Sequence, residues 1–402
     1  MKKRFSSPET LMAHLGEDRG EDRGAHHGAV IPPLYQNSLF TFRDWDDIDA
    51  AFENRTERPI YSRLSNPTTT VAEKKVAALA GEGAACRLFS SGMAAISAAI
   101  FHAVSAGDHV VAVKNVYGPT NNFLNTYLSD KLGLTTTFVA GNHLSDFEQA
   151  VTNKTRLIIL ESPSSAIFSL QDIPAIVAFA KSKGILTMID NTWATPLFQQ
   201  AWAMGVDLEV HSVSKYLGGH SDIVAGAIIS TPERIKDITV KEGEWFGGAI
   251  APFTSWLLTR SLRTLPMRLE RHQQNALKVA SFLEAHPSVR QVRYPGLKSH
   301  PQYDLGQKLM TGYTGLMSFV LNTDDLTLIK RFFNSLDVFQ IGVSWGGHES
   351  LIYAPAISYL KELPPEQFKD LGISLGDMRI SVGLESSQDQ IDDLAAALDQ
   401  VV

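Results

Sequence analysis

The chain has 402 residues, of which 44% are hydrophobic and 20% are charged, a composition typical of a globular protein. Its 36 Lys and Arg residues against 43 Asp and Glu give a net charge of -7 without a basic cluster, so nucleic acid is not an expected partner. No apolar stretch approaches the roughly 20 residues of a membrane helix, and no secretory signal follows the basic start at Met1. With Cys86 as the single cysteine, these features predict a cytoplasmic protein that does not bind membranes.

The middle of the chain alternates short apolar runs with segments of helical periodicity. One predicted helix begins after Asp172 with an early proline, Pro174, and ends near Gly184. Such alternation predicts an α/β fold with a parallel sheet covered by helices on both faces. The strands are predicted at 110–113, 135–139, 157–160, 186–189 and 208–210.

After about residue 253 the pattern changes to that of a smaller α+β domain. A long amphipathic helix is predicted over 256–285, and a last helix begins at Ser387 with Gln390 in capping-box spacing. Strands are predicted at 289–293, 316–321 and 378–382.

The chain is therefore expected to have three parts: an arm over 1–62, a large domain over 63–255 and a small domain over 256–402. The arm is rich in loop signals and is expected to pack on a neighbouring subunit. Its repeat of Gly-Glu-Asp-Arg over 16–23 mixes charges and is interpreted as a solvated stretch with no assigned function.

Asp190 ends one predicted strand, at the position where α/β sheets bind ligands. Taken alone, an aspartate that caps a turn is the more frequent interpretation. Lys215 follows the next strand and is preceded by Ser212 and Ser214, whose spacing of two would point both hydroxyl groups the same way in an extended chain, toward a phosphate. Burial would lower the pKa of this lysine and free a nucleophilic amine, although surface lysines beside serines are common.

A third motif, Ser91-Gly92-Met93, opens an apolar helix. The N–H groups of a helix start can bind a phosphate, and a plain serine cap is the alternative. Together with Asp190 and Lys215, this motif gives a phosphate site, an imine-forming amine and a carboxylate that can keep a pyridine nitrogen protonated. The combination predicts a pyridoxal 5'-phosphate (PLP) domain of the aminotransferase type.

From Tyr61 to the C-terminus the chain resembles the Cys/Met-metabolism PLP family. The motifs that carry the resemblance are Tyr61-Ser62-Arg63, Ser90-Ser91-Gly92-Met93, Tyr117-Gly118-Pro119-Thr120, Asp190-Asn191-Thr192, Ser214-Lys215-Tyr216 and the segments 294–297 and 379–385. The resemblance implies PLP as cofactor and the aminotransferase-like fold (fold type I), with a mostly parallel seven-stranded sheet and a smaller C-terminal domain. It also implies a homo-oligomer, most simply a tetramer of two dimers, and no metal site is expected.

The resemblance further implies roles for individual residues. Lys215 would bind PLP as a Schiff base and carry protons, Asp190 would pair with the pyridinium nitrogen, and Tyr117 would stack on the ring. The residues implied at the phosphate are Ser91, Gly92, Met93, Ser212 and Ser214, with Tyr61 and Arg63 reaching in from a neighbouring subunit. Arg379 would clamp the substrate carboxylate, with Ser344, Trp345 and Tyr61 beside the substrate. Taken alone, Tyr117 would be interpreted as a core aromatic and Arg63 as a solvated arginine.

Four positions depart from the pattern of the γ-synthases and γ-lyases and resemble the bacterial cystathionine β-lyases: Pro119, Ser165, Trp193 and Trp345. Val343 also replaces an acidic residue that is common in the γ-enzymes. The predicted reaction is β-elimination of L-cystathionine to homocysteine, pyruvate and ammonia, with cysteine and cystine as further candidate substrates. The alternatives are a γ-acting relative (cystathionine γ-synthase, cystathionine γ-lyase or methionine γ-lyase) and a PLP-fold protein that binds without turnover.

Overall fold

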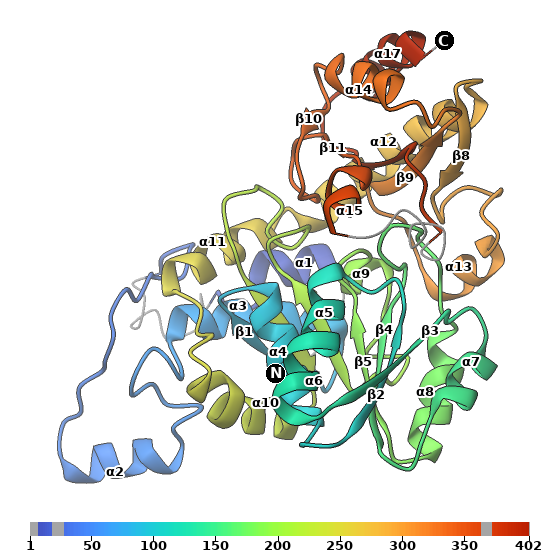
Figure 1. Ribbon diagram of the computed structural model, residues 1–402. Helices are drawn as coiled ribbons and strands as arrows, with labels where there is room; N and C mark the ends of the chain where they lie inside the picture. Colours follow the sequence, from blue (N-terminus) through green and yellow to red (C-terminus); the bar gives the residue numbers. More distant parts are fainter. Residues whose placement is uncertain (1–6, 18–27, 363–371, 402) are drawn as a thin grey trace.

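The structure of the chain is a computed structural model that describes residues 7–17, 28–362 and 372–401. A seven-stranded sheet forms the centre of the larger part, and a five-stranded sheet lies above it in Figure 1. This architecture confirms the predicted α/β fold with a smaller C-terminal α+β part. The proposed domain boundaries at 62/63 and 255/256 stay predictions.

The large sheet has the strand order β1-β7-β6-β5-β4-β2-β3. Its strands are β1 (Ala85–Phe89), β2 (His109–Val113), β3 (Thr135–Val139), β4 (Thr155–Glu161), β5 (Leu186–Asp190), β6 (Leu208–Ser212) and β7 (Gly226–Ser230). Only β7 runs antiparallel to its neighbours, so the sheet is mostly parallel as predicted. The five predicted strands are all present, whereas β1 and β7 were not predicted. The β1 run contains Arg87, and the β7 run is bounded by Gly226 and Ser230, which obscures both apolar patterns.

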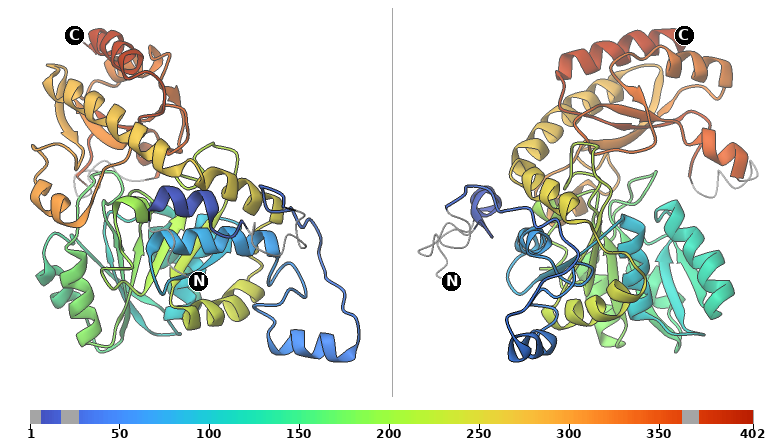
Figure 2. Two further views of the ribbon diagram at one scale, coloured as in Figure 1. Left: turned by 180° about the vertical axis from the view of Figure 1, so that it is seen from behind. Right: turned by 90° about the vertical axis from the view of Figure 1, so that its left-hand side faces the viewer.

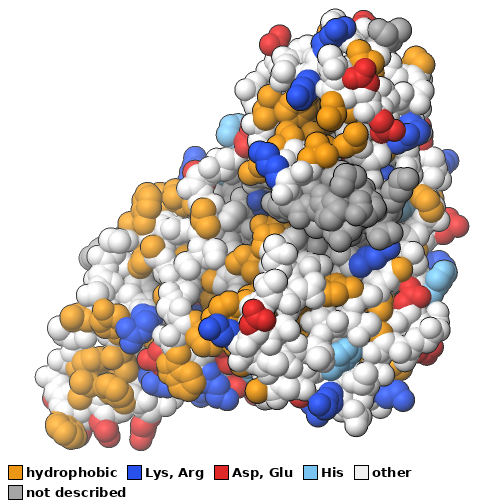
Figure 3. All heavy atoms as spheres, viewed as in Figure 1, with side chains coloured by type: hydrophobic (Ala, Val, Ile, Leu, Met, Phe, Trp, Pro, Cys, Tyr) orange, Lys and Arg blue, Asp and Glu red, His pale blue; other side chains and the backbone are white. Residues whose placement is uncertain are grey.

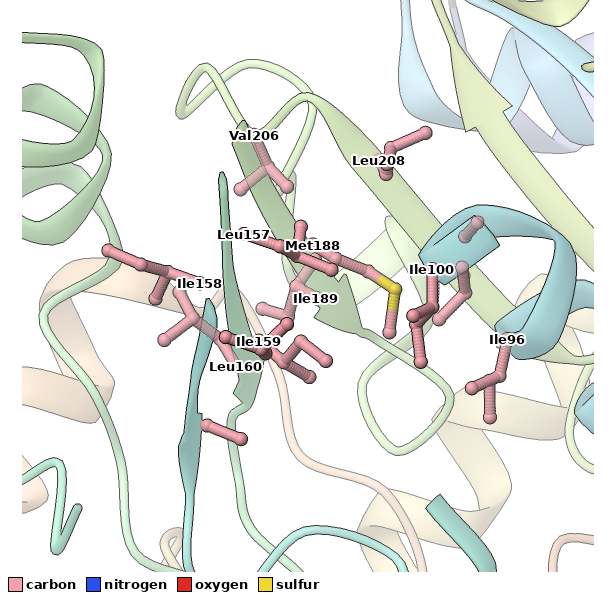
Figure 4. Packing of buried hydrophobic residues seen from close by; sticks show 14 of the residues in the cluster. Ile96, Ile100, Leu157, Ile158, Ile159, Leu160, Met188, Ile189, Val206 and Leu208 are labelled. Carbon is pink, nitrogen blue, oxygen red and sulfur yellow. The ribbon is translucent and has the colours of Figure 1, made fainter. Parts of the chain in front are cut away.

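The buried strands explain the near-continuous apolar runs in the sequence. All five residues of β2 are buried, and Ile158, Ile159 and Leu160 of β4 have no exposed surface. Figure 4 shows Ile158, Ile159 and Leu160 in the same buried cluster as Met188 and Ile189 of the neighbouring strand and Ile96 and Ile100 of a helix. A strand with helices on both faces cannot alternate apolar with polar residues, since neither face meets water.

The helices of the larger part pack on both faces of this sheet, as predicted. On β7, Ile228 belongs to the core on one face, while Ala227 and Ile229 belong to the core on the other. The helices are α3 (Pro67–Ala80), α4 (Gly92–Ala103), α5 (Gly118–Asn122), η1 (Phe123–Leu128), α6 (Ser129–Leu132), α7 (Leu144–Ala150), α8 (Ile173–Ser182), α9 (Thr195–Phe198), α10 (Pro232–Ile238), η2 (Thr239–Gly243) and α11 (Pro252–Leu262). The N-cap of α8 is Asp172, whose carboxylate accepts a hydrogen bond from the Ala175 amide, so this predicted helix start is confirmed.

The five-stranded sheet has the order β10-β11-β12-β9-β8. Its strands are β8 (Val289–Arg293), β9 (Leu316–Leu321), β10 (Gln340–Ile341), β11 (Leu351–Tyr353) and β12 (Asp377–Ser381). The helices beside it are α12 (Leu265–Ala285), α13 (Tyr303–Leu309), α14 (Leu326–Asn334), α15 (Ala356–Glu362), α17 (Ser387–Leu398) and the short η3 (Asp399–Val401).

Two predicted helix boundaries in the C-terminal part were wrong. The single helix over 256–285 is two helices, α11 and α12, because Pro266 has no N–H to donate to the Leu262 carbonyl four residues back and is tolerated only in the first turn of a new helix. The last helix is capped by Ser386, whose hydroxyl accepts a hydrogen bond from the Asp389 amide, and not by Ser387. Two adjacent serines give the same sequence signal, and only the backbone conformation distinguishes them.

The N-terminal segment does not form one extended arm. Helix α1 (Pro8–His14) packs on α3, and the buried Lys75 amine donates to the Met12 carbonyl (2.5 Å) and contacts the Glu17 carboxylate (3.3 Å). Helix α2 (Trp45–Glu53), in contrast, projects from the body of the molecule (Figures 1 and 2). Most of the repeat over 16–23, and the basic N-terminal end, lie outside the described residues.

No helix within the described parts of the chain is long and apolar enough to cross a membrane.

Candidate active site

A cavity of about 500 Å³ lies at the carboxyl ends of β4, β5 and β6. The small sheet and the loop before β11 close it from the other side. The cavity brings together most of the predicted site residues: Ser91, Gly92, Met93, Tyr117, Asp190, Ser212, Ser214, Lys215, Ser344, Trp345 and Arg379. Tyr61 and Arg63 do not line it.

The start of α4 forms one wall of the cavity. Ser91 caps the helix by accepting a hydrogen bond from the Ala94 amide (3.0 Å), which leaves the N–H groups of the first turn at the cavity. A Cβ atom on Gly92 would lie 2.9 Å from the Ser212 Cβ, so this close approach of α4 to β6 requires glycine. The helix start and the Ser212 hydroxyl group therefore form a concave surface that suits a phosphate.

The two serines beside Lys215 are placed differently. β6 ends at Ser212 and the chain turns, so Ser212 and Ser214 do not follow one another along an extended strand as the spacing suggested. The Ser214 hydroxyl accepts a hydrogen bond from the Ala225 amide (3.0 Å) and donates to the Ala225 carbonyl (3.3 Å). Both serines line the cavity, but Ser214 also secures the loop that leads into β7.

The Lys215 amine lies in the cavity and donates to the Ser344 hydroxyl (2.5 Å). Its nitrogen is 5.4 Å from the centre of the Trp345 ring. Burial, together with the positive charge of Arg379, lowers the pKa of Lys215 to about 8, although the Asp190 carboxylate opposes this shift. A neutral, nucleophilic amine is thus accessible near neutral pH.

Asp190 ends β5 and lines the cavity. Its carboxylate accepts hydrogen bonds from both the amide and the hydroxyl of Thr192, so the aspartate does cap a turn. The same Thr192 hydroxyl accepts a hydrogen bond from the Ser212 amide (2.8 Å). Burial raises the pKa of Asp190, while the bonds from Thr192 and the charges of His211 and Lys215 lower it. Asp190 therefore caps a turn and also lines the cavity, where its role as a ligand stays a prediction.

Glu161 lies beside Asp190 and was not predicted as a site residue. The two residues are direct neighbours in the register of β4 and β5, and both line the cavity. The Glu161 carboxyl accepts hydrogen bonds from the Tyr117 amide (2.7 Å) and the Ser165 hydroxyl (2.5 Å). Burial, together with the nearby Asp190 carboxylate, raises the pKa of Glu161 to about 8, although the hydrogen bonds from Ser165 and Tyr117 oppose this shift. An acidic residue at the end of an apolar strand was the available signal, the same signal that identified Asp190.

Tyr117 precedes α5, and its ring lines the cavity. Burial raises the pKa of the Tyr117 hydroxyl, and the Asp190 carboxylate raises it further, so the phenol stays protonated near neutral pH. The core interpretation of Tyr117 is wrong, because the residue is 45% exposed.

Arg379 enters the cavity from β12. Its guanidinium donates to the Val343 carbonyl and lies 5.0 Å from the centre of the Tyr353 ring. Both contacts orient the planar group, which suits two-point binding of a carboxylate.

Tyr61 and Arg63 lie on the arm side of the molecule. Arg63 is 3.6 Å from the Glu244 carboxylate and stacks 5.0 Å from the centre of the Tyr61 ring. The Tyr61 ring is 44% exposed, so it is available to another molecule.

The residues of the cavity fit PLP. The helix start with Gly92 and Ser212 accommodates a dianionic phosphate, Lys215 supplies an amine of lowered pKa, and Asp190 faces the same space as an acceptor for a ring N–H. This fold and this site define a PLP-dependent enzyme of the aminotransferase-like class.

The chain belongs to the family of Cys/Met metabolism PLP-dependent enzymes, whose sequence profile matches residues 9–399. It is 39% identical to the L-methionine gamma-lyase of Treponema denticola, over 94% of each chain. It is 37% identical to the cystathionine gamma-lyase of Bacillus subtilis, over the full length of both, and 38% identical to the cystathionine beta-lyase of Lactococcus lactis subsp. cremoris, over 93% of this chain and 95% of that protein.

A solved structure supports both the fold and the cofactor. The crystal structure of a Campylobacter jejuni protein assigned as O-acetylhomoserine (thiol)-lyase superposes with a TM-score of 0.91 at 31% identity, covering 98% of this chain and 100% of that chain. That structure contains N'-pyridoxyl-lysine-5'-monophosphate, which is PLP joined to a lysine. The family and this likeness confirm the predicted fold class and PLP as the cofactor.

The lowered pKa of Lys215 predicts how PLP attaches to the apoprotein. The rate of covalent attachment should rise with pH through a midpoint near 8 and not near the ordinary lysine value of 10.5, because only the neutral amine reacts. In Arg379→Gln the midpoint should move upward, since a nearby positive charge is lost. Stopped-flow measurement of the visible absorption, with Arg290→Gln on the exposed strand β8 as control, checks this. A midpoint that is unchanged in Arg379→Gln would contradict the assigned cause.

The raised pKa of Glu161 predicts a pH-dependent stability of the PLP-free protein. The folded state keeps the proton up to about pH 8, whereas the unfolded chain releases it near 4.5, so Glu161 costs stability increasingly as pH rises through this window. Glu161→Gln removes the titration. The melting temperature of Glu161→Gln minus that of wild type should therefore increase as pH rises from 4.5 to 8. Thermal melts across this range, with the exposed Glu148→Gln as control, give the comparison, and parallel curves for Glu161→Gln and wild type would disprove it.

Proposed function

We propose that the chain is a PLP-dependent carbon–sulfur lyase that performs β-elimination on L-cystathionine and releases homocysteine, pyruvate and ammonia. The observation that carries this proposal is the position of Trp345 beside the Lys215 amine. The relatives named above include enzymes of both β and γ type at 37–39% identity, so overall similarity does not choose between them.

The residues on the large-domain side would prepare the reaction at Cα. Bound PLP supplies an electron sink for the Cα carbanion when its ring nitrogen is protonated, which Asp190 would maintain. The pKa of Lys215 is about 8, so a substantial fraction of this amine is neutral near that pH. The neutral amine would take the Cα proton of the substrate. Ser344 holds this amine at 2.5 Å and would keep it directed at a single carbon. Tyr117 would cover one face of the ring.

The residues on the small-domain side would bind and orient the substrate. Arg379, oriented by the Val343 carbonyl and the Tyr353 ring, would hold the α-carboxylate at two points. Two-point binding by Arg379 would direct the Cα–H bond toward Lys215. The bound substrate would also exclude the water that otherwise solvates the amine. The sulfur at Cβ then leaves as a thiolate.

Trp345 favours β over γ chemistry. γ-Elimination requires a second proton removal, at Cβ, so the amine must reach two carbons in succession. The Trp345 ring is packed 5.5 Å from the centre of the Tyr216 ring and 5.4 Å from the Lys215 nitrogen, which leaves the amine little lateral freedom. A smaller side chain at this position would relax the constraint.

The product identity tests the proposal directly. The purified enzyme given L-cystathionine should form pyruvate and homocysteine, Lys215→Ala should form neither, and the surface variant Lys241→Ala should behave as wild type. In Trp345→Leu the ratio of 2-oxobutyrate to pyruvate should rise about tenfold, a change of about 1.4 kcal/mol in relative transition-state energy. Chromatography of the keto acids measures both, and 2-oxobutyrate as the main wild-type product would identify a γ-lyase instead.

We further infer that each active site is completed by Tyr61 and Arg63 of a second copy of the chain. Both residues lie outside the cavity of their own chain. The adjacent projecting segment exposes Leu39, Trp45 and Phe52, and the hydrophobic patch over α2 in Figure 3 is of the kind that a partner subunit buries.

Mixed dimers test this shared site. Arg63→Ala and Lys215→Ala should each be inactive alone. When the two are unfolded together and refolded, half of the dimers are hybrids with one intact site, and about a quarter of the wild-type activity should return. A mixture of Asp190→Ala with Lys215→Ala is the matched control. Asp190 and Lys215 of one chain line the same cavity, so every site of a hybrid dimer lacks one of them and the mixture should stay inactive. Failure of the Arg63→Ala mixture to regain activity would place Arg63 in its own chain's site.

A further inference from the structure

A buried carboxylate, Glu209, lies behind the cavity and does not line it. It is the second residue of β6, paired with Ile189 of β5, and it lies three residues before Ser212. Its side chain has no exposed surface. A charged group inside a strand of this core is costly unless several donors bind it, so its presence requires an explanation.

Two donors from different strand ends converge on one oxygen of Glu209. The Asn191 amide group, which directly follows Asp190, donates to Oε1 (2.7 Å). The His211 ring contacts the same Oε1 through Nε2 (2.9 Å). His211 precedes Ser212 and the turn that carries Lys215. One carboxylate oxygen thus joins the segment of the ring-binding aspartate to the segment of the PLP lysine.

The network continues on the Asn191 side and is buried throughout. Asn191 also donates to the Gln199 carbonyl (2.9 Å), and the Gln199 side chain donates to the Ser162 carbonyl (2.7 Å), one residue beyond Glu161. Asn191, Gln199, Glu209 and His211 are each at most 1% exposed. The second oxygen of Glu209 and the Nδ1 atom of His211 have no hydrogen-bond partner among the described residues. Such incompletely satisfied groups in a core indicate that the geometry at Oε1 is retained for a purpose other than stability.

We propose that Glu209 is a positioning residue that fixes the separation between Asp190 and Lys215 by holding Asn191 and His211 on one carboxylate oxygen. PLP must reach both the Lys215 amine and the Asp190 carboxylate at once, so a small shift between the ends of β5 and β6 would loosen one of the two contacts. The bond from the Ser212 amide to the Thr192 hydroxyl (2.8 Å) is a second tie between the same strand ends. This inference rests on the roles proposed above for Asp190 and Lys215.

Substitution of Glu209 should disturb the cofactor more than the fold. In Glu209→Ala both donors lose their acceptor, and PLP should dissociate about ten times more readily, with kcat lower by about 10- to 100-fold and KM changed less than about threefold, as for groups that orient metal ligands in other enzymes. The circular dichroism of the bound cofactor in the visible range should weaken. Glu209→Gln retains an acceptor oxygen and should recover most of the cofactor signal.

His109 of β2, three strands away from β6 in the large sheet, offers a matched control. Its buried ring joins Thr155 (2.7 Å) and Thr137 (2.9 Å) on two neighbouring strands, so His109→Ala also removes buried bonds between strands. It should lower the melting temperature but leave the PLP affinity, the cofactor dichroism and kcat within about twofold of wild type.

The outcomes separate the alternatives. If Glu209→Ala does not fold, His211→Leu can replace it, because this variant removes only the bond from β6 to Glu209. His211→Leu should then show the same losses of PLP affinity, visible dichroism and kcat. Wild-type PLP affinity, dichroism and kcat in the folded Glu209 and His211 variants, or an equal loss in His109→Ala, would overturn the proposal. The cofactor measurements need no assumption about the product, so a wild-type enzyme that forms 2-oxobutyrate would refute β-elimination and leave the role of Glu209 intact.

Discussion

The burial of charged groups at the carboxyl ends of β4, β5 and β6 is the constraint on which the site depends. In water near neutral pH, the Lys215 amine would be protonated, and the carboxyl groups of Glu161 and Asp190 would be ionised. Burial shifts each of them toward its neutral form, which is why the pKa of Lys215 falls to about 8 and that of Glu161 rises to about 8. A cofactor that carries an anionic phosphate and a cationic ring matches the helix start and Asp190, so binding it relieves part of this cost.

The two sheets contribute different chemistry, and α12 connects them. The large sheet supplies the amine and the carboxylates, whereas the small sheet supplies Arg379. From α12, the Arg268 guanidinium donates to the Tyr216 carbonyl (2.8 Å), directly after Lys215. One turn along the same helix, His272 contacts the Val382 carbonyl (2.7 Å), just beyond β12. Burial lowers the pKa of His272 to about 4, so it bonds as a neutral ring. The helix thereby sets the distance between the lysine and the arginine clamp.

Sequence patterns predicted the parts of the structure that are locally encoded. Apolar runs located five strands of the large sheet. The motifs at Gly92, Asp190 and Lys215 identified a helix start and two strand ends that line one cavity, because such positions have their own residue preferences. Properties that depend on packing were not predictable in this way. The pairing of Glu161 with Asp190 and the tie through Glu209 each depend on residues that are distant in sequence. The division of 256–285, in contrast, has a local signal in Pro266, which the prediction of one helix missed.

Selectivity among sulfur amino acids cannot follow from the fold as a whole. Relatives named for β- and γ-lyase activity share nearly the same identity with this chain over more than nine tenths of its length. Overall identity therefore does not distinguish one proton removal from two, and the function proposed above assigns the difference to side chains that limit the reach of the lysine. In the function proposed above, Ser344 and Trp345 would have this effect, since the Ser344 hydroxyl accepts a hydrogen bond from the Lys215 amine and the Trp345 ring lies beside it. Reaction type can consequently change in this family by substitutions that leave the electrostatics of cofactor binding unaltered.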